Sequence, residues 1–191
     1  MSDTATRLAA IARHILVTEG AGAVSMRRVA AAAGLTPMSI YRHFENRDAL
    51  LKHVADECFA EIGRRWAQRP RSGELEQGIA ELLDDHLDFA FGQPRLYDFV
   101  FTEPRDGARR WPDEFRDGGS PSLSLAADVL RGGITRGELR DDDEWELALM
   151  FAAMLHGLIQ MYRGGRIGLP EDDLRSLCHR LVERMLNGFR V

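Results

Sequence analysis

A short segment near the N-terminus carries side chains suited to contact with a nucleic acid. If the segment is helical, its outward face holds Pro37, Met38, Ser39, Tyr41, Arg42 and His43. These side chains combine hydrogen-bonding groups, apolar groups and a cation. The edges of base pairs in a major groove offer hydrogen-bond acceptors, donors and the thymine methyl group, all of which such a helix can contact. The sequence therefore predicts a DNA-reading helix at this position.

The preceding residues predict a second helix and a tight turn that would position the first. Ser25 can cap this earlier helix, because its hydroxyl can accept a hydrogen bond from a backbone N–H. Gly34 follows where the chain needs a left-handed conformation, which a residue without a Cβ adopts without steric cost. Thr36 is placed to cap the DNA-reading helix, and Pro37 suits its first turn. We expect that helix to extend to about Phe44.

The stretch from Ser25 to Leu51 resembles the tetracycline-repressor (TetR) family of transcription regulators. The resemblance rests on the small and apolar residues around Gly34, on the segment from Ile40 to Phe44, and on the step from Ala49 to Leu51. It implies a helix-turn-helix DNA-binding domain. Beyond these residues the likeness lies only in the order and length of the elements.

The resemblance also implies a set of DNA-binding residues. Contacts to base edges are expected from Arg27, Met38, Ser39 and Arg42, with Pro37 against a thymine methyl group. Contacts to phosphates are expected from Ser25, Thr36, Tyr41, His43, Arg47 and Lys52, and Arg28 completes the predicted set. Met38 cannot donate a hydrogen bond and departs from the polar residues often found there in the family.

The distribution of charge supports a nucleic-acid partner although the whole chain has a net charge of −5. Residues 1–53 contain seven Lys and Arg against four Asp and Glu, a net charge of +3, so the remainder carries −8. A basic part joined to an acidic part orients the encounter with DNA, because phosphates attract one and repel the other. A small three-helix scaffold without a nucleic-acid partner remains the alternative.

The spacing of apolar residues predicts an all-α protein of about nine helices in two domains. We expect a helix-turn-helix domain over residues 1–48, and a helical ligand-binding and dimerisation domain over residues 49–191. Outside the motif, helices are expected over residues 4–19, from Asn46 onward, and over 74–91, 95–102, 123–136, 145–162 and 171–189. Prolines and glycines are dense over 103–122, which predicts a mobile flap with at most one short helical turn.

The last two helices predict association with a second copy. Residues 145–162 are apolar on nearly every face, so one face can pack on the core and another on a partner. Residues 171–189 carry apolar residues at a regular spacing that is typical of helices in four-helix bundles. The expected dimer contacts are Leu158, Met161, Leu174, Leu177, Leu181 and Met185.

Several aromatic, histidine and methionine residues of the second domain could line a ligand cavity. They are Trp66, His86, Phe101, Trp111, Phe151, Met154 and His156. Core packing explains the aromatic residues and Met154 equally well, and a hydrogen-bonded core residue is the favoured interpretation of each histidine. Asp84 and Asp88 share a helix face from which His86 points away, so this group does not predict a metal site. We expect no cofactor and no metal.

The sequence predicts a regulator and not an enzyme. It has no glycine-rich phosphate loop, no nucleophile elbow and no metalloprotease motif. The resemblance implies a ligand-responsive repressor that binds a palindromic operator as a homodimer and is released by a small molecule. An activator of the same family, or a helical small-molecule-binding protein without specific DNA binding, remains open.

The sequence predicts the cellular location, because it shows neither a secretory signal nor a membrane-spanning segment. No basic region followed by an apolar run starts the chain, and no uncharged stretch is long and apolar enough to span a bilayer. We therefore expect a cytoplasmic protein with no membrane partner. Cys58 and Cys178 fall on apolar helix faces and are expected to be reduced and buried.

Overall fold

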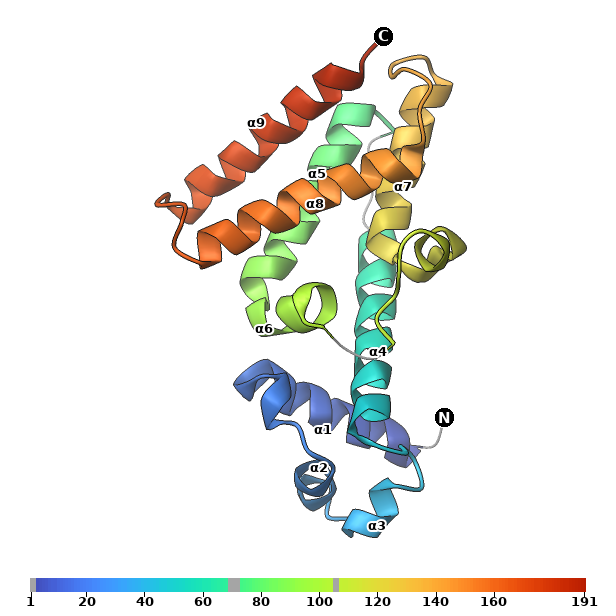
Figure 1. Cartoon of the computed structure of the whole chain (residues 1–191), viewed down its shortest axis with the longest axis vertical. Coiled ribbons are helices and arrows are strands. Elements are labelled where there is room, and N and C mark those ends of the chain that lie inside the picture. Colours follow the sequence, from blue (N-terminus) through green and yellow to red (C-terminus); the bar gives the residue numbers. More distant parts are fainter. Residues whose placement is uncertain (1–2, 69–72, 105–106) are drawn as a thin grey trace. The chain divides into compact units, whose positions relative to one another are not determined.

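The computed structural model describes residues 3–68, 73–104 and 107–191. Nine α-helices lie within these ranges, which contain no β-strand and one isolated antiparallel bridge between Leu139 and Arg190 (Figure 1). The predicted all-α fold is confirmed. None of the helices in the described part of the chain is both long and apolar enough to cross a membrane.

The chain divides into two compact units. The head unit comprises Met1–Glu61 and Phe91–Ala108, and the body unit comprises Ile62–Ala90 and Arg109–Val191. Helices α4 (Arg47–Ala67) and α5 (Leu75–Gly92) each contribute residues to both units. The two units are therefore connected by continuous helical backbone.

The head unit packs α1 and several short helices and turns around the first part of α4. It contains α1 (Asp3–Glu19), the 3₁₀ turn η1 (Ala21–Ala23), α2 (Met26–Ala32), α3 (Pro37–Ile40), α6 (Pro94–Tyr97) and the π-helical turn η2 (Asp98–Thr102). Every one of these helices except η1 contributes buried side chains. The core includes Leu8, Leu16, Val29, Ile40, Leu50, Val54, Tyr97 and Phe99, none more than 2% exposed.

Two predictions about the start and the end of α3 are wrong. The α-helix ends at Ile40, not near Phe44 as predicted. A turn follows, in which the His43 N–H donates to the Ile40 carbonyl at 2.9 Å. The Thr36 side chain does not cap the helix, because its hydroxyl hydrogen-bonds the Ser39 hydroxyl at 2.9 Å instead. Ser25 does cap α2 as predicted, accepting from the Arg28 N–H at 3.3 Å.

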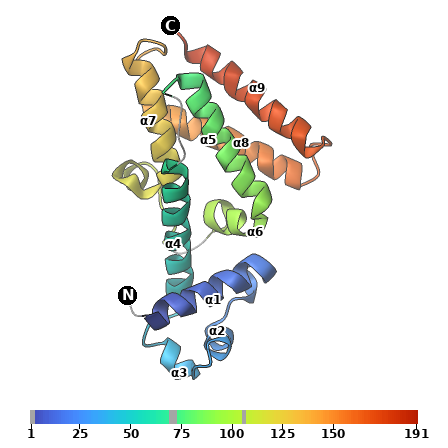
Figure 2. The same ribbon diagram turned by 180° about the vertical axis from the view of Figure 1, so that it is seen from behind.

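The body unit contains the remaining long helices. They are the main part of α5, α7 (Pro121–Thr135), α8 (Glu144–Arg163) and α9 (Glu171–Phe189), with the π-helical turn η3 (Phe115–Gly119). Helix α8 passes over one side of α5, as the two opposite views show (Figures 1 and 2). On α5, Asp84 and Asp88 pair with His179 and Arg175 of α9 at 2.8 and 2.9 Å. Helix α5 therefore contacts both C-terminal helices.

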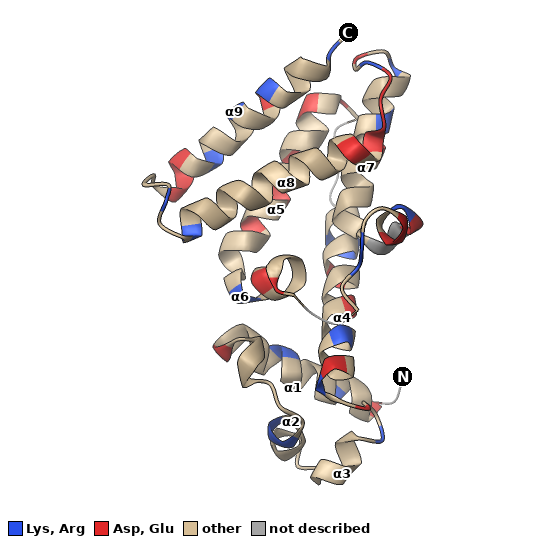
Figure 3. Ribbon diagram, viewed as in Figure 1, with Lys and Arg blue, Asp and Glu red and all other residues tan. Residues whose placement is uncertain are grey.

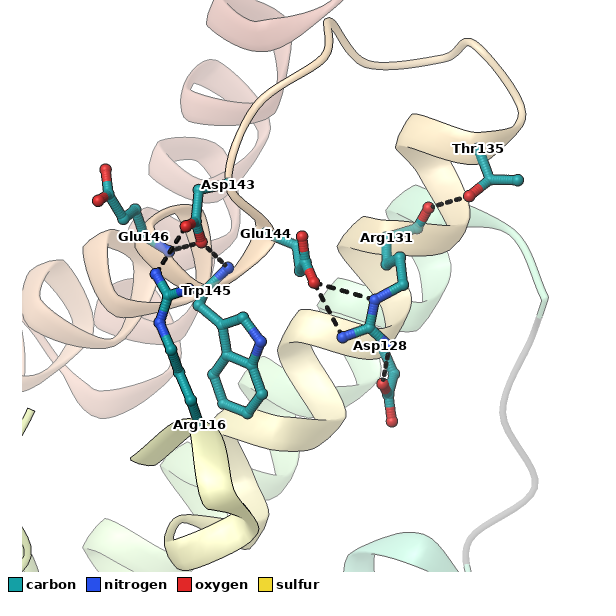
Figure 4. Close-up of polar contacts among 8 residues, drawn as sticks. All are labelled: Arg116, Asp128, Arg131, Thr135, Asp143, Glu144, Trp145 and Glu146. Atoms are coloured by element: carbon teal, nitrogen blue, oxygen red, sulfur yellow. Dashed lines mark hydrogen bonds and ion pairs between the residues drawn. The ribbon is translucent and has the colours of Figure 1, made fainter. Parts of the chain in front are cut away.

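The segment expected to be a flap is attached to the start of α8. Arg116 of η3 pairs with the Asp143 carboxylate at 2.6 Å, and this carboxylate also caps α8 by accepting from two backbone N–H groups (Figure 4). The hydrogen bond from Arg116 lowers the pKa of Asp143. Residues 105 and 106 of the predicted flap lie outside the described residues. The last two residues of the predicted flap, 121 and 122, belong to α7, which begins at Pro121.

Candidate nucleic-acid interface

The turn between α2 and α3 presents the predicted DNA-reading residues. Gly34 has φ +68°, the left-handed conformation that its position required. Pro37 occupies the first turn of α3, where its missing N–H leaves no hydrogen bond unmade. Ile40 is fully buried and fixes the opposite face of the helix in the core. The local sequence therefore determines which face of α3 points outward.

The outward face of α3 and the turn after it is largely exposed and carries the guanidinium of Arg42. Met38 is 73% exposed and Tyr41 is 51% exposed, which makes them the most exposed large apolar side chains among the described residues of the head unit. Pro37, Arg42 and His43 are exposed as well, and Ser39 is half-buried. The structure thus brings all six predicted residues to one short segment, with apolar groups beside a guanidinium.

Four of the five predicted cations of the interface fall into two groups. Arg27 and Arg42 are exposed, and within the described residues neither side chain forms a hydrogen bond or ion pair. Arg28 binds Glu19, with Nη1 2.9 Å from Oε2, and Lys52 Nζ is 2.7 Å from Asp56 Oδ2. These exposed pairs contribute little to stability, so a phosphate can compete with the carboxylate for either cation.

Arg47 differs from the other cations because two nitrogens of its guanidinium donate to backbone carbonyls at short distances. Its Nε donates to the Val24 carbonyl at 2.9 Å, and its Nη2 donates to the Ala21 carbonyl at 2.7 Å. The remaining nitrogen, Nη1, lies 3.5 Å from the Asp48 carboxylate. The family resemblance implied a phosphate contact for Arg47, and the local sequence does not indicate this contact between α4 and the linker from α1 to α2.

Two further positioning residues were not identified from the sequence. Arg7 of α1 donates from Nη2 to the Ala33 carbonyl at 2.8 Å, at the end of α2. Asn46 caps α4, accepting from the Ala49 N–H at 2.8 Å. The preference of helix N-termini for asparagine could have indicated the second contact. Nothing in the local sequence indicates the first, because its two residues lie in different helices.

The residues predicted to bind a ligand do not all belong to one unit. In the body unit the His86 ring lies 5.8 Å from Trp66 and 4.9 Å from His156, measured between ring centroids. Phe101 belongs to the head unit, where its ring contacts Phe59 and Tyr97. The other predicted residues lie in the body unit: Trp111 against Phe115 and Arg116, and Phe151 and Met154 on α8.

Two histidines of the body unit, buried His86 and half-buried His156, have pKa values below the usual value of a histidine. Burial lowers the pKa of His156 to about 4. Burial, with a smaller contribution from His156, lowers the pKa of His86 well below its usual value. A neutral imidazole can donate one hydrogen bond and accept another. We therefore expect both imidazoles to be uncharged at neutral pH.

The predicted dimer residues differ in exposure. Met161 is 46% exposed, and Leu158, Leu177, Leu181 and Met185 are half-buried. Leu174 is fully buried within its own chain. On α8, Met150, Ala153, Gly157 and Met161 form an exposed apolar stripe at helical spacing, and no charged residue lies between Glu146 and Arg163 (Figure 3).

Comparisons with known proteins agree with this arrangement. Residues 5–54 match the family model for bacterial regulatory proteins of the tetR family, and residues 79–185 match the model for the tetracyclin repressor-like C-terminal domain. The chain belongs to the TetR family. It is a transcriptional regulator with an N-terminal DNA-binding domain, as the resemblance implied.

One curated relative and two solved structures illustrate the likeness. The chain is 24% identical to the HTH-type transcriptional repressor KstR2 of Rhodococcus jostii (strain RHA1), over 78% of this chain and 74% of the relative. A protein of unknown function from Rhodococcus sp. RHA1 has a TM-score of 0.79 at 22% identity, covering 100% of this chain and 97% of its own. RolR in complex with resorcinol has a TM-score of 0.69 at 21% identity, covering 98% and 88%.

Proposed function

We propose that this protein is a ligand-responsive repressor that binds a pseudo-palindromic operator as a homodimer. The observation that carries the proposal is the outward face of α3 and the turn after it, where Met38, Tyr41 and Arg42 are exposed. A helix with this face fits a major groove, and Arg27 on the neighbouring helix adds a second cation. The description of the relative KstR2 as a repressor supports the direction of regulation.

The apolar stripe on α8 supports the homodimer. Ala153 and Gly157 are small and exposed, and they lie between Met150 and Met161. Small residues allow two helix backbones to approach closely, and the surrounding methionines can then bury their side chains against the partner. A homodimer formed through this stripe carries two copies of α3, one for each half-site of a pseudo-palindromic operator.

We propose that the effector is an uncharged small molecule bound in the body unit. Neutral His86 and His156 can hydrogen-bond such a compound, and Trp66 beside them can pack against an aromatic ring. RolR, which shares the fold, binds resorcinol. Binding would favour a position of α4 in which the two heads no longer match the operator, provided that the ligand binds that state more tightly.

A binding titration tests the proposed function. Operators are first selected from a random duplex library with the wild-type protein, and affinity is then measured by fluorescence anisotropy at increasing salt. We expect a palindromic consensus and an affinity that falls steeply as salt rises. Binding without sequence preference would favour a small-molecule-binding protein that lacks specific DNA recognition. Resorcinol is the first effector to test, by loss of anisotropy and by a shift in Tm.

A further inference from the structure

The first residue of α4 forms a bridge that the proposed function does not use. Arg47 directs two nitrogens of one guanidinium at the Ala21 and Val24 carbonyls, which both belong to the linker between α1 and α2. Two parallel donors in one plane are a property of arginine that lysine lacks. The contact therefore fixes an orientation as well as a distance.

The linker held by Arg47 leads directly into the DNA-reading motif. Val24 is 1% exposed, and the next residue, Ser25, caps α2. The far end of α2 is held in the same manner, because Arg7 donates to the Ala33 carbonyl. Helix α2 is thus fastened at its start to α4 and at its end to α1. The turn that leads to α3 follows at once.

All three nitrogens of the Arg47 guanidinium already face an oxygen of the protein, so few of its N–H groups are available to DNA. Nε and Nη2 are occupied by carbonyls at hydrogen-bond distance, and Nη1 faces the Asp48 carboxylate at 3.5 Å. Arg28 and Lys52 each have an exposed carboxylate partner, which a phosphate can replace, and the contact of Arg28 Nη1 with the Ala23 carbonyl is long, at 3.4 Å. A phosphate at Arg47 would instead have to take both donors from the Ala21 and Val24 carbonyls. The Ala21 carbonyl would then keep the hydrogen bond from the Val24 N–H, whereas the Val24 carbonyl would lose the guanidinium donor.

We propose that Arg47 is a positioning residue that sets the orientation of α2 and α3 relative to α4, and that it does not bind phosphate. The inference rests on the proposed function, because orientation has a consequence only if α3 reads an operator. A residue in this role raises the affinity for the operator much more than the affinity for unrelated DNA. A phosphate ligand raises both equally.

The experiment compares Arg47→Ala with wild type and with Arg65→Ala, which removes the same charge from an exposed position in the body unit. Affinities for the selected operator and for a scrambled duplex are measured against salt, at a temperature where circular dichroism shows every variant folded. We expect Arg47→Ala to lose about tenfold or more in operator affinity, the equivalent of one charge-assisted hydrogen bond. We expect the scrambled-duplex affinity and the salt slope to match those of Arg65→Ala.

Two results would overturn the inference. A phosphate contact predicts equal losses on both duplexes and a salt slope smaller by about 0.9 per head, or about 1.8 per dimer. In that case Arg47→Lys, which keeps the charge, would restore the wild-type slope. A purely structural role predicts a lower Tm with both affinities unchanged in the folded protein.

Hydrogen exchange separates failure of the inference from failure of the proposed function. If wild type does not distinguish operator from scrambled duplex, the proposed function is wrong. The bridge is then judged from the backbone amides of residues 21–28. Faster exchange of these amides in Arg47→Ala than in Arg65→Ala supports the bridge, and unchanged exchange overturns it.

Discussion

Helices α3 and α8 both expose apolar side chains, but the charges around them differ. On α3 and the turn after it, Met38 and Tyr41 are 73% and 51% exposed and Arg42 follows directly. On α8, Met150 and Met161 are 37% and 46% exposed, in a stretch without any charged residue (Figure 3). A short apolar patch beside a guanidinium suits DNA, which offers both methyl groups and phosphates. A long uncharged stripe suits another apolar helix.

The comparison shows that exposed apolar residues indicate a partner only when their surroundings are considered. If the two surfaces have separate partners, variants on α3 change DNA affinity and leave the assembly intact. Variants on α8 act first on the assembly.

The largest effect is expected from Gly157→Glu on α8. Gly157 is exposed, and a Cβ built there meets no atom within 4 Å, so the folded chain can accept the substitution. In a symmetric dimer two carboxylates would be buried without partners, at a cost of several kcal/mol each. We expect the dimer dissociation constant to rise at least about 1000-fold, measured by analytical ultracentrifugation. Gly157→Ala is the control, and an unchanged dimer in Gly157→Glu would remove α8 from the interface.

The next largest effect is expected from Arg42→Ala. Each dimer carries two copies, and a bidentate contact to a base contributes about 1–3 kcal/mol. We expect operator affinity to fall about 100-fold with no change in molar mass, measured by anisotropy and light scattering. A loss no larger than that of Arg65→Ala would show that Arg42 contributes only its charge.

A dependence of stability on pH is expected from the body unit. The pKa of His156 is about 4 in the folded chain, against about 6.5 in an unfolded chain. Between these values the unfolded state binds more protons than the folded state. The contribution of His156 to the free energy of unfolding is therefore fully present above about pH 6.5 and is lost as the pH falls toward 4. The slope is at most about 1.4 kcal/mol per pH unit for each buried histidine.

Urea unfolding at pH 7, 6 and 5 measures this loss of stability. His156→Gln should flatten the pH dependence relative to wild type, whereas His14→Gln, at an exposed position of the head unit, should not. Equal profiles for all three proteins would contradict the assignment to the body core.

The smallest effect is expected from Met38→Ala. The thioether can cover a thymine methyl group, and a buried methyl contributes about 0.8 kcal/mol. We expect replacement of one operator thymine by uracil to lower wild-type affinity about fourfold and to have no effect on Met38→Ala. Equal sensitivity of both proteins to uracil at every position would show that Met38 does not read the operator.

Local rules predicted the helices and the turn well. Ser25, Gly34 and Pro37 act where their backbone preferences placed them, and the all-α class followed from helical spacing alone. The end of α3 was placed too late. Residues 41–43 instead adopt a tighter turn, which the apolar pattern does not distinguish from a helix.

Contacts between distant residues could not be predicted in the same way. The guanidinium of Arg47 and the carbonyls of the α1–α2 linker are more than twenty positions apart, and their meeting depends on how three helices pack. For the same reason sequence alone grouped Phe101 with His86 and His156, although Phe101 packs in the head unit. Residue type indicates which chemistry is available, whereas packing decides where it acts.

The burial of both thiols makes the protein suitable for spectroscopic labelling. Cys58 and Cys178 are each at most 1% exposed, and burial raises the pKa of Cys178, so neither should react readily with a maleimide or a nitroxide reagent. One cysteine introduced at an exposed position of α2, such as Ala31→Cys, would then carry the only accessible label in each chain. Double electron–electron resonance between the two labels of a dimer would measure the distance between the two head units with and without resorcinol. Cys58 and Cys178 would not need to be replaced.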